Sequence, residues 1–346
     1  MTRTELTTGL SVDTTGLSAF LATCTPDPGQ ISNVELLTGG SSNLCVSVVS
    51  GGRRLVLRRR PIGNIPEQAH DMLREYDTLR MLARTPVRVP TVYGYCDDES
   101  IIGAPFYVMD FIDGIVVQSS YDVRLIAPAA RAEICDDLVR VLAALHAVPL
   151  SDFATYQLGR SSNVMQRHLH RWLERWWNRP HRDLPAIDRI ADELRRRLPA
   201  SEELTFVHGD YRIGNTVVNP HGGERPVLAV LDWELSTFGH PLTDLAHLLG
   251  YWEGTGTIRS HQAQSIAAEV GFPDAAQLAE SYATYSGRSV EHLPVFVAFE
   301  HWRGAIIKEA IYQRRMQTGA PRAEVDDARR GVDSHLAEAT ARLETA

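Results

Sequence analysis

The chain has 346 residues, of which 44% are hydrophobic and 23% charged, and this composition is typical of a globular protein with a sizeable core. A formal net charge of −8 disfavours a surface that binds nucleic acid. The four cysteines lie far apart and form no CxxC pair, so they predict neither a zinc site nor a disulfide framework but buried free thiols.

The N-terminal residues MTRTELTTGLSVD lack the basic and apolar regions of a signal peptide. No apolar run approaches the length that a membrane-spanning helix needs. We therefore expect a cytoplasmic protein that contacts neither a membrane nor nucleic acid. Its oligomeric state stays open.

The first third of the chain predicts strands. The runs VELL, LCVSVV and RLVLR are separated by the turn signals TGGSSN and SGG, a pattern typical of antiparallel hairpins. The stretch EQAHDMLREYDTLRMLA then predicts one helix, because its apolar residues form a single stripe. RVPTVYGYC and APFYVMDFI predict two further strands. We expect a β-rich lobe with one helix over residues 1–112.

The remainder, residues 113–346, predicts a second lobe that is mainly helical. Helical periodicity is present in the segments RLIAPAARAEICDDLVRVLAALHAV, NVMQRHLHRWLERWWNR, AIDRIADELRRRL, PLTDLAHLLGYW, QAQSIAAEV, LPVFVAFEHWRGAIIKEAIYQRRM and VDSHLAEATARLE. We therefore predict an α+β fold of two lobes, and a cleft between lobes is a favoured place for a ligand.

One stretch interrupts these helices, FVHGDYRIGNTVVNPHGGERPVLAVLD at 206–232. TVV and VLAVL are β-type runs around a turn-rich segment, so they predict a hairpin. If Val218 faces Ala229, then Asn215 faces Asp232, since facing residues of an antiparallel pair have a constant index sum. Asp210 lies in the loop that leads in.

Two carboxylates and an amide would thus meet at one end of the hairpin, and hard oxygens of this kind suit Mg²⁺ when substrate phosphates complete its shell. In this interpretation Asn215 and Asp232 hold the metal, while Asp210 orients or deprotonates an attacking hydroxyl. Each residue taken singly could instead be a turn former that caps a strand. The complete pattern, H-x-D-x4-N followed by strand, turn, strand and Asp, favours the site.

HGDYRIGN followed by LDWE resembles the catalytic and metal-binding segments of the aminoglycoside phosphotransferase and choline kinase family, distant relatives of the protein kinases. The resemblance implies a bilobal protein-kinase-like fold with Asp210 as the catalytic carboxylate and with Asn215 and Asp232 as metal ligands. It implies ATP or GTP as co-substrate with Mg²⁺. His208 would brace the loop and Asp244, in GHPLTDLAHLL, would support it.

The same resemblance implies where the nucleotide lies. LLTGGSSNLCVSVV is similar to the hairpin that covers the phosphates, although it lacks G-x-G-x-x-G. FYVMDFIDG is similar to the segment whose main chain meets the adenine. The residues implied at these two places are Gly39, Gly40, Ser41, Ser42 and Asn43, together with Met109, Asp110 and Phe111. Each segment could equally be an ordinary turn or a buried strand.

Kinases place a lysine on the third strand, yet the single lysine of this chain is Lys308, far from that strand. RLVLRRRP occupies the strand, and its alternation puts Arg58 and Arg60 on one face. We predict that Arg58 takes the place of the lysine and pairs with Glu75 on the following helix. Arg59 is expected to be a solvated arginine.

The acceptor of the phosphoryl group is less well defined by the sequence. The helical segment at 163–182 carries many arginines and histidines around its tryptophans, which suits an anionic or apolar-aromatic acceptor better than a polycation, although the tryptophans could be packing residues. Candidate contacts to the acceptor are Tyr211, Glu234, Trp172 and Trp176.

The arginine on the third strand resembles one branch of the family, typified by VLRRP, GGxSN and LDWE, which includes the kinase-like domains fused to acyl-CoA dehydrogenases; this chain has VLRRRP, GGSSN and LDWE. This likeness implies a hydroxyacyl compound or its CoA thioester as acceptor, with an antibiotic as the alternative. Two other classes of function stay open. A pseudokinase is suggested by the missing lysine, and a metal-dependent hydrolase could use the same oxygens, although it would need more ligands than the cluster offers.

Overall fold

The computed structural model describes residues 3–5, 10–37, 43–61, 71–153, 163–199, 203–253 and 269–345. The chain forms two compact units. The first contains residues 1–114 and 228–234, and the second contains residues 115–227 and 235–346. The segment 228–234, which follows the predicted hairpin turn, therefore returns to the first unit.

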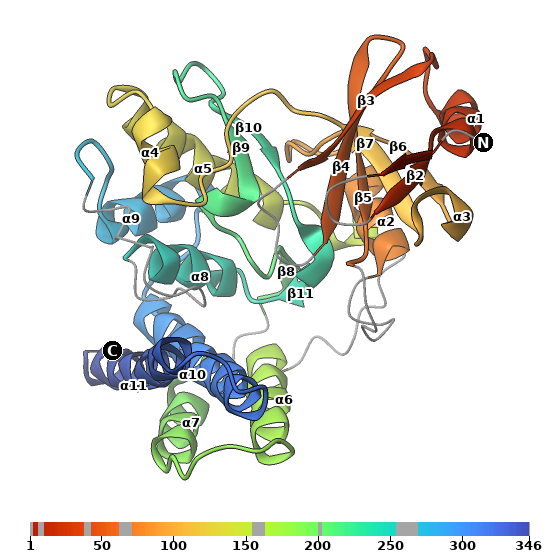
Figure 1. Ribbon diagram of the computed structural model, residues 1–346. Coiled ribbons are helices and arrows are strands. Elements are labelled where there is room, and N and C mark those ends of the chain that lie inside the picture. Colours follow the sequence, from red (N-terminus) through yellow and green to blue (C-terminus); the bar gives the residue numbers. More distant parts are fainter. Residues whose placement is uncertain are drawn as a thin grey trace. The chain divides into compact units, whose positions relative to one another are not determined.

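The first unit is built on a five-stranded antiparallel sheet in the order β3-β4-β5-β7-β6 (Figure 1). Its elements are β1 (Arg3–Glu5), β2 (Ser11–Asp13), α1 (Thr14–Cys24), β3 (Ile31–Leu37), β4 (Leu44–Ser50), β5 (Arg53–Arg59), α2 (Met72–Leu82), β6 (Val92–Cys96), α3 (Glu99–Ile102) and β7 (Phe106–Asp110). The predicted strands and the predicted helix are confirmed. The sequence patterns missed β1, β2, α1 and α3.

Alternation along β5 assigns its side chains to two different surroundings. Leu55 and Leu57 join the apolar core that α1, α3 and β2 complete on one face of the sheet. Val56 and Arg58 therefore point to the opposite face, where α2 packs against β6 and β7. This face carries the charged residues of the candidate site.

Arg59 corrects one prediction, because it is only 4% exposed and is not a solvated arginine. Its guanidinium donates hydrogen bonds to the carbonyl oxygens of Ile102 and Arg60. A buried arginine needs such acceptors, since an unpaired buried charge is costly.

The cysteine prediction is also wrong in part: the four thiols are free, but Cys24 and Cys45 are only partly buried.

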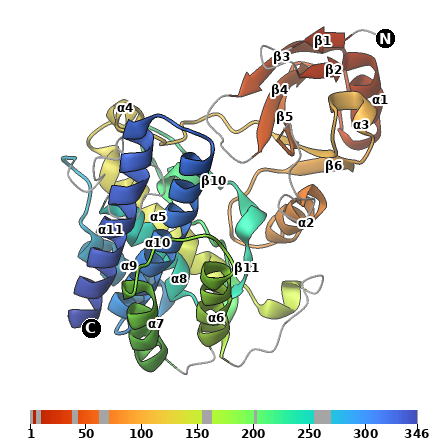
Figure 2. The ribbon, with the colours of Figure 1, turned by 60° about the horizontal axis from the view of Figure 1, so that its bottom comes forward.

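The second unit is mainly helical, as the sequence predicts. Its helices are α4 (Ser120–Leu125), α5 (Ala130–His146), α6 (Val164–Trp177), α7 (Ala186–Arg197), α8 (Leu242–Trp252), α9 (Ala275–Ser286), α10 (Leu293–Gln317) and α11 (Arg322–Glu344), with the 3-10 helix η2 (Leu150–Phe153) after α5. Most of QAQSIAAEV, one of the predicted helices, lies outside the described residues. Figure 2 shows α6, α7, α10 and α11 packed side by side.

Short strands frame the stretch at 206–232. β8 (Thr205–Val207) pairs antiparallel with β11 (Thr237–Gly239), and the 3-10 helix η3 (Ile213–Asn215) leads into β9 (Thr216–Val218). β10 (Val227–Val230) follows the turn and precedes the 3-10 helix η4 (Trp233–Leu235). The turn is closed by the Asn219 N–H group, which donates to the carbonyl oxygen of Pro226 at 2.7 Å. Within the described residues, no helix is long and apolar enough to span a membrane.

Candidate active site

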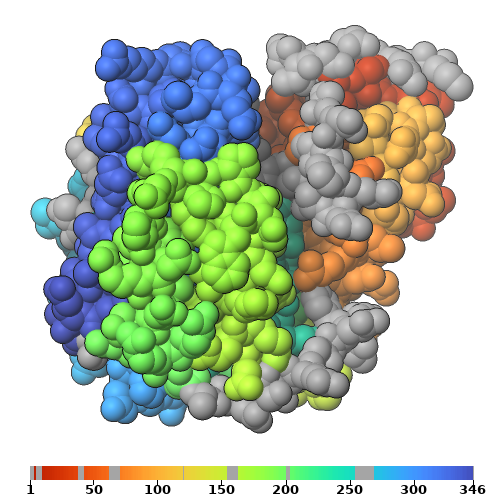
Figure 3. Space-filling view, turned by 90° about the horizontal axis from the view of Figure 1, so that it is seen from below, coloured from red at the N-terminus to blue at the C-terminus, as the bar shows by residue number. Residues whose placement is uncertain are grey.

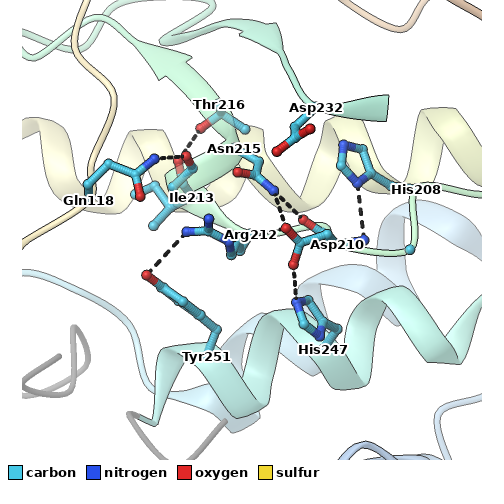
Figure 4. A network of polar contacts seen from close by, with 12 residues as sticks. Gln118, His208, Asp210, Arg212, Ile213, Asn215, Thr216, Asp232, His247 and Tyr251 are labelled. Carbon is cyan, nitrogen blue, oxygen red and sulfur yellow. Dashed lines mark hydrogen bonds and ion pairs between the residues drawn. The ribbon is translucent and has the colours of Figure 1, made fainter. Parts of the chain in front are cut away.

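The carboxylate of Asp210 is held by donors on both of its oxygens (Figure 4). Asn215 Nδ2 donates to Oδ2 at 2.6 Å, and His247 Nε2 lies 2.7 Å from Oδ1. Arg212 Nε is 3.6 Å from Oδ2. The loop between β8 and η3 therefore presents a carboxylate of fixed orientation, surrounded by groups that favour its charged form.

These contacts decide the protonation state of Asp210. Burial alone would raise its pKa, but the hydrogen bond and charge of His247, with the charge of Arg212, hold the pKa of Asp210 well below its usual range. Burial would likewise lower the pKa of His247, yet its bonds to Asp210 and Glu300 raise that pKa to about 9. The pair is thus an ionised carboxylate and an imidazolium at neutral pH.

His247 is a site residue that the sequence reasoning missed. It lies on α8 three residues after Asp244, so both side chains project from one face of the helix. Its other ring nitrogen, Nδ1, is 3.2 Å from Oε2 of Glu300 on α10, and that carboxylate is also paired with Arg303. Its i, i+3 spacing from Asp244, which the sequence analysis did name, could have indicated that His247 also faces the loop.

The loop itself is suspended from Asp244, whose side chain is buried. Its Oδ2 accepts the N–H of His208 at 2.7 Å, and its Oδ1 accepts the N–H of Gly209 at 2.8 Å. His208 Nδ1 in turn accepts the N–H of Asp210 at 3.2 Å. These are supporting contacts of the kind that the resemblance implies for Asp244 and His208.

Gly209 stands where protein kinases carry an arginine, and the backbone explains the difference. Its φ of +83° lies in the left-handed region, and a Cβ atom built there would approach the carbonyl oxygen of Leu235 to 2.6 Å. Both conditions exclude a side chain at this position without a shift of the loop.

Asn215 is oriented by its amide nitrogen, which donates to the main-chain oxygen of Asp210 at 2.9 Å as well as to its carboxylate. The carbonyl oxygen of the same amide is thereby turned away from Asp210. It is a hard oxygen donor of the type that Mg²⁺ prefers. Asn215 belongs to the second unit and Asp232 to the first, so their predicted meeting stays a prediction.

The first unit contains further predicted site residues, Arg58, Glu75 and Asp232. Arg58 Nε donates to Oε2 of Glu75 at 3.0 Å, which is the pairing that the sequence predicts. Arg58 Nη2 is paired with Oδ1 of Asp232, and Oε1 of Glu75 accepts the N–H of Trp233 at 3.1 Å. One buried arginine fork thus ties β5, α2 and the segment after β10 together.

The guanidinium of Arg58 keeps its charge in this cluster. Burial disfavours the guanidinium, but the carboxylate of Glu75 and the further negative groups outweigh it, so the pKa of Arg58 is raised. Asp232 has a φ of +66°, a conformation that is uncommon for a residue other than glycine. Its side chain is 25% exposed, and no hydrogen bond to its Oδ2 is present within the described residues.

Asn43 is the described member of the predicted phosphate-binding turn, since Gly39, Gly40, Ser41 and Ser42 lie outside the described residues. Its Nδ2 donates to Oε2 of Glu234 at 2.9 Å. Its Oδ1 is buried and has no hydrogen-bond partner within the described parts of the chain. The role of Glu234 at an acceptor stays a prediction.

The segment predicted to meet the base lies at the end of β7. Met109 pairs with Val56 across the sheet. The N–H of Asp110 donates to the carbonyl oxygen of Thr91 at 2.9 Å, and the N–H of Phe111 donates to that of Arg54 at 3.3 Å. A base bound here would have to use other main-chain groups or displace these acceptors.

The acceptor predictions need one correction. Tyr211 is fully buried, and its hydroxyl donates to the carbonyl oxygen of Leu138 at 2.7 Å, so it fastens the loop to α5 and does not face an acceptor. Trp176 is also buried and stacks on His181 with ring centroids 3.9 Å apart. Trp172 is partly exposed on α6. Both tryptophans line a groove between α6 and α10.

Comparison with known proteins shows the family. The model of the phosphotransferase enzyme family matches residues 33–280. The chain belongs to this family. It is a transferase of the small-molecule kinase class.

Two curated relatives are longer proteins. Acyl-CoA dehydrogenase family member 11 of Rattus norvegicus is 32% identical over 310 residues, which are 87% of this chain and 39% of that protein. Family member 10 of Mus musculus is 32% identical over 281 residues, 80% of this chain and 26% of that protein. The phosphotransferase chain thus spans between about a quarter and two fifths of these relatives.

Solved structures show the fold. A protein of Ralstonia eutropha JMP134, assigned as an aminoglycoside phosphotransferase, is 31% identical with a TM-score of 0.79, covering 96% of this chain and 98% of that one. The GDP complex of aminoglycoside 2′-phosphotransferase-IIIa is 15% identical with a TM-score of 0.60, covering 94% and 99%. The predicted kinase-like fold is confirmed.

Proposed function

We propose that this phosphotransferase moves the γ-phosphoryl group of ATP, with Mg²⁺, to a hydroxyl group of a small molecule. The observation that carries the proposal is the carboxylate of Asp210, which is kept ionised and oriented by Asn215 and His247. A nucleotide co-substrate is supported by the GDP that the aminoglycoside 2′-phosphotransferase holds in a similar fold. GTP is the alternative donor.

The step uses Asp210 as the group that faces the acceptor. The acceptor oxygen forms a bond to the γ-phosphorus as the bond between that phosphorus and the β,γ-bridging oxygen breaks, so that ADP leaves. The proton of the hydroxyl passes to Asp210. A carboxylate of low pKa is a weak base, which suits a loose transition state in which the proton moves late.

The oxygens present fit a magnesium site. We assign the amide oxygen of Asn215 and the carboxylate of Asp232 as the ligands, because Asn215 is turned by its own amide nitrogen and Asp232 retains an oxygen without a described partner. The bound metal would neutralise negative charge on the nucleotide phosphates. Arg58 would add a permanent positive charge at the α and β phosphates in place of a lysine.

The leading acceptor is a hydroxyacyl compound or its CoA thioester. The support comes from two relatives that are named as acyl-CoA dehydrogenase family members and share about a third of their aligned residues with this chain. An antibiotic is the second candidate, since the Ralstonia protein assigned as an aminoglycoside phosphotransferase is equally similar and matches over nearly its whole length.

The test is a mass-spectrometric screen for the gain of one phosphoryl group across hydroxyacyl-CoAs, amino alcohols and antibiotics, with ATP or GTP. The matched control is Asp210→Asn, which should abolish transfer while a calorimetric titration shows nucleotide binding nearly unchanged. Transfer by Asp210→Asn at the rate of the native protein would contradict the role of Asp210. Nucleotide binding without any turnover of ATP in the native protein would favour a pseudokinase.

A further inference from the structure

A groove of about 310 Å³ lies between α6 and α10 in the second unit. In Figure 3 the green atoms of α6 and α7 and the blue atoms of α10 meet on the face that is shown. The floor of the groove is apolar and contains Trp172, Trp176, Ile306, Ile307 and Ile311. Trp172 and Trp176 are candidate acceptor contacts from the sequence, so a ligand in this groove deepens the proposed function, although no groove residue takes part in the phosphoryl-transfer step itself.

The rim of the groove is positively charged. Arg175, Arg179 and Arg314 line it, all three are exposed, and none of them forms an ion pair with a carboxylate within the described residues. Arg175 lies over the ring of Trp172, with its Cζ atom 4.6 Å from the ring centroid. The rim thus carries three guanidinium groups that have no carboxylate partner among the described residues.

The single carboxylate of the groove does not offset this charge. Glu309 is buried and accepts the main-chain N–H of Arg182 at 2.9 Å and its Nε at 2.8 Å. Gln313 donates to it at 2.8 Å. Because the charge of Glu309 is already compensated by Arg182, it neither pairs with the rim arginines nor strongly repels an anion that they attract.

The position of two rim arginines at helix C-termini explains part of the charge around the groove but not the groove itself. Arg175 and Arg314 lie in the last turns of α6 and α10, where a cation is favoured by the helix dipole without any ligand. The dipole does not account for a concave apolar floor beside them. A cavity that combines apolar walls with a few charged groups is the usual form of a small-molecule site.

The groove also adjoins the residues around Asp210. Ile307 lines both the groove and a small cavity of about 20 Å³ that is formed with His247, Glu300 and Arg303. Arg303 lies 5.9 Å from the ring centroid of Trp172 and is paired with Glu300. A chain of contacts within the second unit therefore runs from the groove wall to the candidate catalytic carboxylate.

We propose that this groove binds an amphipathic small-molecule anion. Its apolar chain or ring packs on Trp172, Trp176 and the isoleucines, and its carboxylate or phosphate pairs with the rim arginines. The planar guanidinium group of arginine can form paired hydrogen bonds with a carboxylate or with a phosphate. Either an alkyl carboxylate or an aryl phosphate therefore has the required chemistry.

Isothermal titration calorimetry with decanoate, 1-naphthyl phosphate and decyltrimethylammonium tests the proposal. We expect both anions to bind and the cation of equal chain length to bind at least about tenfold more weakly. The stronger of the two anions distinguishes an alkyl carboxylate from an aryl phosphate as the better ligand type. Equal binding of cation and anion, or no binding of either anion, would overturn the proposal.

Variants locate the site. Arg175→Gln and Arg314→Gln should each weaken the anions about fivefold, and Ala310→Phe should fill the groove and remove binding, with circular dichroism to verify folding. Arg189→Gln, an exposed arginine of α7 outside the groove, is the matched control and should change nothing. Asp210→Asn should also bind normally, so loss of the proposed phosphotransferase activity and loss of this site are distinguishable.

Discussion

The Nε2 atom of His247 lies 2.7 Å from Oδ1 of Asp210, and this contact joins α8 to the candidate catalytic loop. The opposite ring nitrogen faces Glu300, which Arg303 also contacts from α10. An imidazolium between two carboxylates is therefore the element that sets the charge and the direction of Asp210.

The first prediction concerns pH. The folded-state pKa of His247 is raised to about 9 from an ordinary value near 6.5, so its stabilising contribution is complete below about pH 6.5 and is lost as the pH rises to about 9. The groups that face it are Asp210, Glu300 and Arg303. The free energy of unfolding should decrease over this range by on the order of 3 kcal/mol. Urea denaturation at a series of pH values measures the change.

His247→Gln is the diagnostic variant, because a glutamine can still donate to Asp210 but does not titrate. Its stability should be nearly independent of pH between about 6.5 and 9. His170→Gln, an exposed histidine of α6, is the control and should keep the native pH dependence. The assignment fails if His247→Gln shows the same decrease as the native protein.

The second prediction concerns the arginine that occupies the lysine position. Arg58→Lys keeps a positive charge but cannot donate in a fork to both Glu75 and Asp232. We expect about tenfold weaker nucleotide binding by calorimetric titration, since Arg58 is assigned to the phosphates. Arg80→Lys, an exposed arginine of α2, should bind nucleotide as the native protein does. Unchanged binding in Arg58→Lys and also in Arg58→Met would exclude a phosphate contact.

The third prediction separates two costs at Gly209. Gly209→Ala must adopt a positive φ and must also relieve a contact of 2.6 Å with the carbonyl oxygen of Leu235, so it should lose about 3 kcal/mol or more of stability. Gly287→Ala has a similar φ of +68° but no atom within 4 Å of the new Cβ, and should lose only about 1 kcal/mol. Thermal or urea unfolding compares the two. Equal losses would show that the contact with Leu235 is unimportant.

The fourth prediction concerns the support of the loop. Asp244→Asn leaves one of the N–H groups of His208 and Gly209 without its acceptor in a buried place, because an amide presents a single acceptor oxygen. We expect a loss of about 2–4 kcal/mol and a lower kcat. Asp192→Asn, an exposed residue of α7, should stay within about 0.5 kcal/mol of the native protein. A fully stable and fully active Asp244→Asn would remove its supporting role.

Several features were accessible from the sequence because they depend on neighbours along the chain. Alternation in β5 predicts that Arg58 and Val56 share one face of the strand, the kinase resemblance adds Glu75 as its partner, and the strand runs and turns predict the antiparallel hairpins before β5. The fixed spacing of His208, Asp210 and Asn215 marks the loop that forms the candidate site. The helical pattern of the second unit follows from its apolar stripes.

Other features were decided only by the tertiary structure. His247 reaches Asp210 because α8 packs beneath the loop, and Glu300 joins them from a helix far along the chain. Arg59 and Tyr211 read as polar residues near a site, yet each is buried against a carbonyl oxygen of a distant segment. The periodicity of a segment reports which of its residues share a face, but it carries no information on which other segment covers that face. Contacts between distant residues, and hence the charge state of Asp210, are determined only when the helices and loops have packed.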